Sequence, residues 1–128
     1  MSALTGIAIG DALPTETFQL DRAMLSNYAK ASGDLNPIHI DEAFAKNVGL
    51  PNVIAHGMLT MALVGKYISD FAGGSAKVVE FGARFTKPVI VPADEKVDLT
   101  VTATVAEIVR ASPVLVLLNC AHVRVAEP

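Results

Sequence analysis

Two histidines lie where polar and turn-forming residues gather, and the first of them has a carboxylate nearby. His39 follows Asp34 by five positions in the stretch Asp34-Leu-Asn-Pro-Ile-His39. A carboxylate and an imidazole can hold and polarise one water molecule between them, and an imidazole exchanges its proton near neutral pH. The pair therefore predicts acid–base chemistry. The spacing alone leaves a second interpretation open, in which Asp34 satisfies turn amides and His39 is an ordinary loop residue.

The second histidine, His56, directly precedes Gly57 and a long apolar stretch. A glycine at the start of a helix presents its backbone N–H without a side chain in the way. Such a donor, aided by the helix dipole, suits an oxygen that gains negative charge during a reaction. The alternative is that Gly57 only lets the chain turn tightly. For His56 the favoured interpretation is a capping or buried hydrogen-bonding residue.

Metal and cofactor sites are not predicted. The three histidines lack the spacing of a zinc site, and the single cysteine, Cys120, can form neither an internal disulfide nor a site with several thiolates. No glycine-rich phosphate loop or dinucleotide fingerprint is present. The net charge of −3 and the absence of a basic patch argue against binding to nucleic acid.

The chain has the length and composition of one folded domain. Its 128 residues are 52% hydrophobic and 18% charged, which excludes intrinsic disorder and predicts an aliphatic core. Nineteen uncharged residues separate Lys46 from Lys66, close to the length of a membrane span. Because the stretch contains Pro51 and Gly57, it favours a loop followed by a buried helix over a span. The N-terminus resembles no secretory signal, so we expect a cytoplasmic protein.

Capping residues predict where the first helices begin and end. Asp21 is a plausible N-cap of a helix that ends by Gly33. The residues that follow cannot form a regular helix, because Pro37 holds the residue before it in an extended conformation. Asp41 is the expected cap of a second, short helix, and Gly49 stands where a helix of that length would end.

The remaining pattern predicts one long helix and a sheet. Residues 57–71 are apolar on nearly every face, which is typical of a helix buried on most sides. Residues 15–20 favour an edge strand, and residues 79–85 alternate as a half-buried strand does. Alternation continues in 97–105, and a turn leads to a strand over 114–125. Consecutive strands with short turns pair antiparallel, so the chain is expected to be α+β, with an antiparallel sheet wrapped around the long helix.

Two blocks of the sequence resemble a known family. The first is Tyr28-Ala-Lys-Ala-Ser-Gly-Asp-Leu-Asn-Pro-Ile-His39, and the second is Ile54-Ala-His-Gly-Met-Leu-Thr-Met61. Together, and in their separation, they are similar to the hydratase-2 motif and the start of the central helix in MaoC-like dehydratases, the (R)-specific enoyl-thioester hydratases. Within that family they look most like the B subunits of mycobacterial (3R)-hydroxyacyl-carrier-protein dehydratases. The resemblance covers residues 8–105 and is strongest over 28–61.

The resemblance implies a single hot-dog domain over residues 1–128 and the reversible hydration of a trans-2-enoyl thioester. Carried over by position, the catalytic aspartate and histidine of the family fall on Asp34 and His39. The amide that binds the thioester carbonyl falls on Gly57, and Asn36 and Pro37 match positions that shape the loop. The implied substrate is a thioester of coenzyme A or of an acyl carrier protein, with no cofactor.

Two departures from the family pattern bear on assembly. Some stand-alone hydratases carry a serine where this chain has Gly65, and the tail is shorter than usual by about one strand. The resemblance implies a homodimer or larger assembly, and the departures suggest a heterodimer with a related hot-dog subunit. Two other functions stay open, a non-catalytic or regulatory subunit that binds acyl thioesters and a hot-dog thioesterase.

Overall fold

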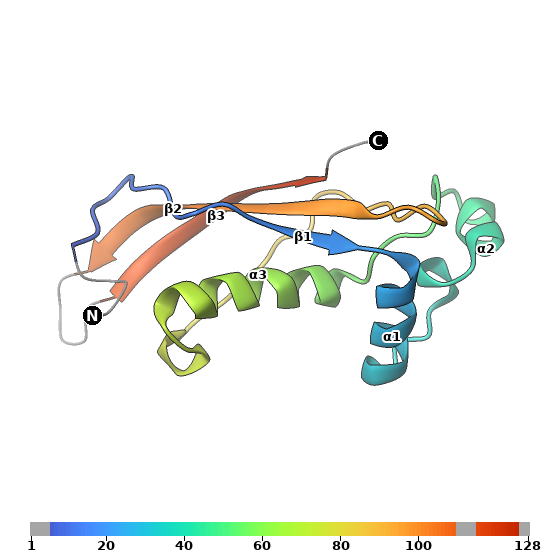
Figure 1. Ribbon diagram of the computed structural model, residues 1–128, viewed down its shortest axis with the longest axis horizontal. Coiled ribbons are helices and arrows are strands. Elements are labelled where there is room, and N and C mark those ends of the chain that lie inside the picture. Colours follow the sequence, from blue (N-terminus) through green and yellow to red (C-terminus); the bar gives the residue numbers. More distant parts are fainter. Residues whose placement is uncertain (1–5, 110–114, 126–128) are drawn as a thin grey trace.

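The computed structural model describes residues 6–109 and 115–125, the latter as backbone only. A long helix lies across one face of an antiparallel sheet, and two shorter helices gather at one end (Figure 1). The elements, in chain order, are β1 (Glu16–Leu20), α1 (Arg22–Ser32), the 3-10 helix η1 (Pro37–His39), α2 (Glu42–Asn47), α3 (Gly57–Ala72), the 3-10 helix η2 (Ser75–Lys77), β2 (Val97–Val109) and β3 (Leu115–Val125).

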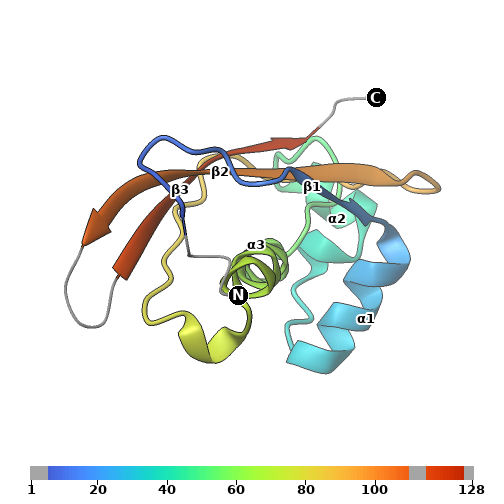
Figure 2. The ribbon, with the colours of Figure 1, turned by 60° about the vertical axis from the view of Figure 1, so that its left-hand side comes forward.

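The sheet has the order β1-β2-β3, with both pairs antiparallel. Leu20 pairs with Val97 at one end of β1, and Leu99 of β2 pairs with Val125 of β3. Every second residue of β2 from Val97 to Val105 is buried, which confirms the predicted alternation. This apolar face lies over α3, as the view nearly along that helix shows (Figure 2). The sheet and α3 thus enclose the core between them.

The predicted helix boundaries are confirmed by the caps. The carboxylate of Asp21 accepts a hydrogen bond from the Met24 amide at 2.8 Å, and α1 ends at Gly33, which has a φ of +78°. Asp41 caps α2 in the same way, through the Phe44 amide at 3.1 Å. The loop that precedes α3 is not helical, and no helix within the described residues is long and apolar enough to cross a membrane.

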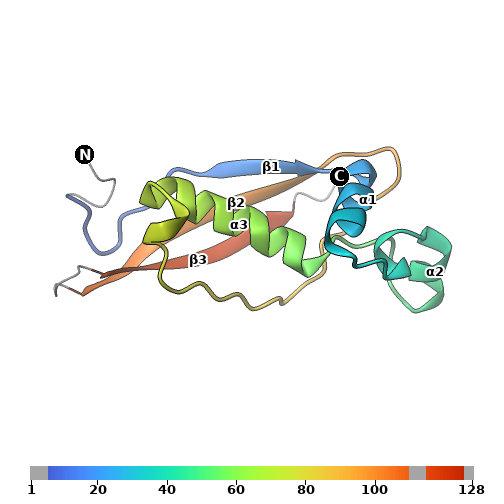
Figure 3. The same ribbon diagram turned by 90° about the horizontal axis from the view of Figure 1, so that it is seen from below.

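The strand predicted over residues 79–85 is not formed. Residues 79–88 make no backbone hydrogen bond with any other described residue, and the described sheet ends at β3. Alternation of apolar and polar residues indicates only that a segment has two different faces. A strand also needs a neighbouring strand with which to pair. Since this segment has none among the described residues, the prediction is wrong for this chain. The segment instead runs alongside α3 in the opposite direction (Figure 3).

Two phenylalanines of this segment pack against two glycines of α3. An added Cβ at Gly65 would lie 3.4 Å from the Phe81 ring, and one at Gly57 would lie 3.5 Å from the Phe85 ring. The spacing matches, because four residues of extended chain cover about 13 Å and eight residues of helix cover about 12 Å. A Cβ would still fit at either glycine, whereas a larger side chain would push the segment away from the helix.

The long helix is less covered than its composition predicts. Only four of its 16 residues are buried, and Met58 is 60% exposed. The expectation of a helix buried on most sides is wrong within a single chain, because the three strands cover only one side of α3. The Met58 side chain, and that of Phe85 on the segment beside the helix, are left facing solvent.

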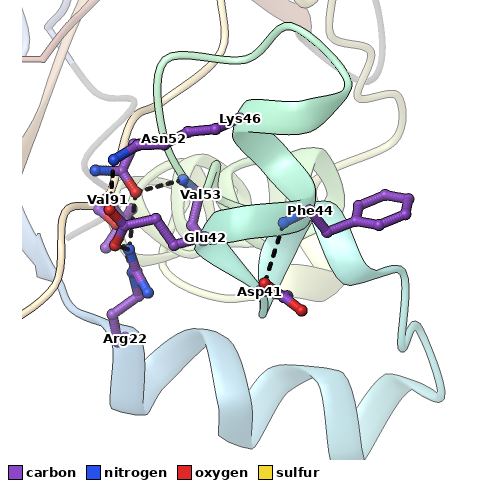
Figure 4. A network of polar contacts seen from close by, with 8 residues as sticks. All are labelled: Arg22, Asp41, Glu42, Phe44, Lys46, Asn52, Val53 and Val91. Carbon is purple, nitrogen blue, oxygen red and sulfur yellow. Dashed lines mark hydrogen bonds and ion pairs between the residues drawn. The ribbon is translucent and has the colours of Figure 1, made fainter.

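Arg22 of α1 forms hydrogen bonds to α2 and to two other segments, at Asn52 and Val91 (Figure 4). Its guanidinium donates to the Val91 carbonyl at 2.6 Å, to the Asn52 side chain at 2.9 Å and to Glu42 at 3.1 Å. Hydrogen bonds from Lys46 and Arg22 lower the pKa of Glu42 from its usual value. The stabilisation that Glu42 provides is therefore present above the ordinary glutamate pKa and is lost as the pH falls through the lowered value.

Arg22→Ala is expected to lower the free energy of unfolding by about 2 kcal/mol, because it leaves the Val91 carbonyl and Asn52 without a charged donor. Urea denaturation followed by circular dichroism measures the change. Lys66→Ala is the control, since it removes an exposed ion pair with Asp70 within one helix and should leave the midpoint unchanged. Equal midpoints for both variants would show that the Arg22 contacts contribute nothing.

Candidate active site

The loop between α1 and α2 is held by local hydrogen bonds. The Asp34 amide donates to the Ser32 hydroxyl, the Asn36 amide to the Asp34 carboxylate and the Ile38 amide to the Asn36 side chain, each at 3.2 Å. Asn36 is thereby the N-cap of η1, and Pro37 is its first residue. Such side-chain-to-backbone bonds fix turns where neither helix nor strand can form. The loop presents Asp34 at the surface.

His39 stands at the end of η1 with its ring turned inward. Its side chain is 8% exposed, and Nδ1 lies 2.7 Å from the carbonyl oxygen of Ile54. A carbonyl can only accept, so Nδ1 carries the proton of this bond and Nε2 of the neutral ring is free to accept. The backbone makes a parallel link, because the Ile54 amide donates to the Ile38 carbonyl at 3.2 Å. The hydrogen bond thus fixes the tautomer and the orientation of the ring.

His56 lies against both Asp34 and His39. It is 1% exposed, its Nε2 is 3.1 Å from the carbonyl oxygen of Asp34, and its ring stacks on that of His39 with centroids 4.0 Å apart. Tyr28 meets the same ring edge-on at 4.8 Å. The sequence-based interpretation of His56 as a buried hydrogen-bonding residue is confirmed. The stack was not predicted, because nothing in the sequence indicates that residues 39 and 56 meet.

The arrangement of these groups suits acid–base work better than metal binding. Ligand-type atoms of Asp34, His39 and His56 all lie within 4.8 Å of one another. The two imidazole planes, however, are only 26° from parallel, so their in-plane lone pairs cannot converge on one ion.

Gly57 opens α3 beside the same groups. The amides of Leu59 and Thr60 both donate to the His56 carbonyl, and the Thr60 hydroxyl donates to the Gly57 carbonyl at 2.8 Å. The Gly57 amide belongs to the first turn, where helical amides have no partner within the helix, and it has none among the described residues. The first turn therefore offers a free donor at the positive end of the helix dipole.

A cleft of about 280 Å³ brings His39 and Gly57 together. It is lined by these two residues, by Thr60 and by residues 85–89. Asp34 is not part of its wall and lies beside His39 on the exposed side of the loop. Thr60 and Phe85 were missed from sequence. A polar residue one turn after Gly57 in an apolar helix is a signal for Thr60, whereas Phe85 belongs to residues 79–85, for which a half-buried strand was expected.

Other candidate residues lie elsewhere. Gly65 faces Phe81 rather than the cleft. The side chain of Cys120 lies outside the described part of the structure.

Comparison with known proteins agrees with this architecture. The family model of the MaoC-like domain matches residues 6–117. The chain belongs to the MaoC-like domain family. It is 39% identical over 80 residues to 3-hydroxyacyl-thioester dehydratase X of Mycobacterium tuberculosis, an alignment that covers 62% of this chain and 28% of that protein.

Solved structures of the MaoC-like family share the fold. A MaoC-like dehydratase superposes with a TM-score of 0.79 at 37% identity, covering 91% of this chain and 37% of the other. The R-hydratase PhaJ1 from Pseudomonas aeruginosa, in its unliganded form, gives 0.67 at 31% identity, covering 85% and 67%. The predicted α+β hot-dog fold is therefore confirmed. The chain spans only about a quarter of the length of the M. tuberculosis relative.

Proposed function

We propose that this chain catalyses the reversible addition of water to a trans-2-enoyl thioester, giving the (R)-3-hydroxyacyl thioester, in fatty-acid metabolism. The observation that carries the proposal is that His39, whose Nε2 is free, shares a cleft with Gly57, while the Asp34 carboxylate lies beside His39 at the edge of that cleft. The names of two relatives, a 3-hydroxyacyl-thioester dehydratase and an R-hydratase, support the same reaction. The thioester is carried by coenzyme A or by an acyl carrier protein.

The Asp34–His39 pair moves the protons in this proposal. A water molecule held between the Asp34 carboxylate and Nε2 of His39 attacks C3 of the enoyl group. As the new C–O bond forms, one O–H bond of the water breaks and its proton passes to the pair, while the π electrons of the double bond move toward the thioester carbonyl. The pair then returns a proton to C2 on the same face, so that H and OH add across the double bond and the enzyme is unchanged.

The Gly57 amide stabilises the charge that forms. When the thioester oxygen becomes enolate-like, a preorganised N–H at the start of a helix favours that charge over the neutral ground state. The Thr60 hydroxyl, by holding the Gly57 carbonyl, keeps the first turn in place. The Phe85 ring at Gly57 forms the apolar wall that faces the bound thioester.

Two alternatives differ in what happens to the substrate. A subunit that only binds acyl thioesters needs the cleft but not a carboxylate beside a free imidazole nitrogen, and the pair here counts against it. A thioesterase would use the same water to break the C–S bond and would release a thiol. The hydration assay below separates the three.

We further propose that the chain pairs with a second hot-dog subunit through residues 79–85. Ten consecutive residues without a backbone partner among the described residues, and exposed apolar side chains at Val79 and Phe85, favour addition of a strand. The exposed side of α3 near Met58 needs the same cover. A homodimer is expected for the chain produced alone, and a heterodimer with a related subunit is the alternative.

One prediction of the proposed function concerns the Asp34–His39 pair. Asp34→Asn and His39→Asn should each lower kcat for hydration of crotonyl-CoA by about 10²–10⁴-fold. Asparagine at position 39 can keep a donor to the Ile54 carbonyl while it removes Nε2. Asp41→Asn is the matched control, because asparagine also caps a helix and the position is outside the site, so turnover should be unchanged. Loss of the conjugated enoyl absorbance measures hydration.

A thiol reagent in the same assay detects release of coenzyme A. Thiol release without hydration would identify a thioesterase, and binding without either reaction would identify a binding subunit. Near-wild-type turnover in Asp34→Asn would show that the proposed mechanism is wrong.

The second prediction concerns Gly57. Gly57→Ala adds a Cβ at ordinary contact distance from Phe85 and should keep most activity. Gly57→Val places two further methyl groups between the amide and the cleft, so kcat should fall by about 10²-fold, as for loss of an oxyanion donor. Steady-state kinetics beside melting curves measure both effects. If the valine variant keeps its fold and full turnover, the Gly57 amide does not contact the thioester.

The third prediction concerns assembly. Light scattering at micromolar concentration should give twice the monomer mass of 13.4 kDa. Gly82→Pro should shift the protein toward monomer, because proline cannot donate to a paired strand, whereas no described backbone bond of the single chain depends on Gly82. Gly82→Ala is the control and should remain dimeric. A dimer unaffected by the proline would place the interface elsewhere, and a wild-type monomer that assembles only with a co-purified hot-dog subunit would favour the heterodimer.

A further inference from the structure

His56 contacts both members of the Asp34–His39 pair, although the proposed reaction gives it no proton to move. We propose that His56 is a positioning residue, which holds the Asp34 backbone through Nε2 and the His39 ring through the stack. The inference rests on the proposed function, since it assigns His56 a part in the same site.

The first step is the hydrogen bond to Asp34. Because the partner of Nε2 is a carbonyl oxygen, Nε2 must carry the proton. The other two hydrogen bonds of Asp34, to Ser32 and Asn36, lie within its own loop. Among the described residues, only His56 forms a hydrogen bond that links Asp34 to the start of α3. Without it, the exposed carboxylate is held only by a turn that can move as a unit.

The second step is the stack on His39. One hydrogen bond to the Ile54 carbonyl fixes Nδ1 of His39 but leaves the ring free to tilt about that contact. A second ring at 4.0 Å, only 26° from parallel, restricts that tilt and sets the direction of the free Nε2. The Tyr28 ring packs edge-on against the His56 ring and keeps it from moving away from His39. Positioning of this kind matters, since a misplacement of about 1 Å can cost about 10²-fold in rate.

The unpaired ring nitrogen of His56 supports the same role. Nδ1 of His56 is buried and has no hydrogen-bond partner. A buried acceptor without a donor is unfavourable, and a side chain that only filled this space, such as phenylalanine, would avoid that cost. The donor on Nε2 is the property that a hydrocarbon ring lacks. Because His56 is also the N-cap residue of α3, it sets Asp34, His39 and the Gly57 amide in one frame.

Two substitutions separate the hydrogen bond from the packing. His56→Phe keeps a ring against His39 and loses the donor, whereas His56→Gln supplies an N–H near Nε2 and loses the ring. We expect His56→Phe to lower kcat for crotonyl-CoA by about 10–10²-fold with KM within about twofold, and His56→Gln to recover part of that loss.

Tyr67→Phe is the matched control. It removes another buried side-chain bond to a backbone carbonyl, from the Tyr67 hydroxyl to Pro14 at 2.7 Å, on a later turn of α3. It should lower the melting temperature by a few degrees and leave kcat unchanged. A folded His56→Phe variant with the kcat of this control would overturn the proposal, and so would a glutamine variant no better than the phenylalanine variant.

A measurement on the wild-type protein does not depend on variants that fold. Long-range ¹H–¹⁵N spectra distinguish the histidine tautomers, and we expect His56 protonated on Nε2 and His39 protonated on Nδ1. His56 protonated on Nδ1 instead would contradict the positioning role, because it could not donate to Asp34. If the expected tautomers are found but crotonyl-CoA is not hydrated, the proposed function fails while the contact to Asp34 stands.

Discussion

Two backbone carbonyls, each bonded to a histidine ring, hold the candidate site together. The Ile54 carbonyl bonds to His39, and the Asp34 carbonyl bonds to His56. Each bond crosses between the loop after α1 and the chain that enters α3, so the two segments hold one another in both directions. The ring stack follows from these two hydrogen bonds, since they bring both imidazoles to the same place between the two segments, where the rings lie against one another. The free nitrogen of His39 is a consequence of the same arrangement, whereas the Gly57 amide is free because it belongs to the first turn of α3.

The core provides the rigid frame on which these two hydrogen bonds depend. The alternating residues of β2 and the apolar face of α3 exclude water between them, and Arg22 ties α1 and α2 to the segment at Val91. A site built from a loop and a helix start would otherwise be free to open. Here the loop is short, because Gly33 ends α1 and Asp41 begins α2 only eight positions later.

Features that depend on neighbouring residues were predictable from sequence, and those that depend on distant partners were not. The caps at Asp21 and Asp41 and the alternation of β2 follow from local chemistry, and all are confirmed. The segment 79–85 has the pattern of a strand but no partner in the described sheet, so pattern alone gave the wrong state. His56 was correctly expected to be buried, but its contact with His39 joins residues 17 positions apart, with α2 between them in the sequence. The catalytic roles proposed for Asp34, His39 and Gly57 come from the family resemblance, because spacing alone left a structural interpretation open.

The unpaired segment connects assembly with the site. Its residue Phe85 lies against Gly57, and residues 85–89 form one wall of the cleft. Within one chain, this wall is held by ring-to-glycine contacts and by the Val89 carbonyl, which accepts from Ala55 at 2.8 Å. A partner strand along 79–85 would add backbone hydrogen bonds immediately before Phe85 and fix the ring over the helix start. Under the proposed pairing, the second subunit therefore contributes to the shape of the cleft without supplying a catalytic group, and loss of the dimer should weaken thioester binding before it alters the Asp34–His39 pair.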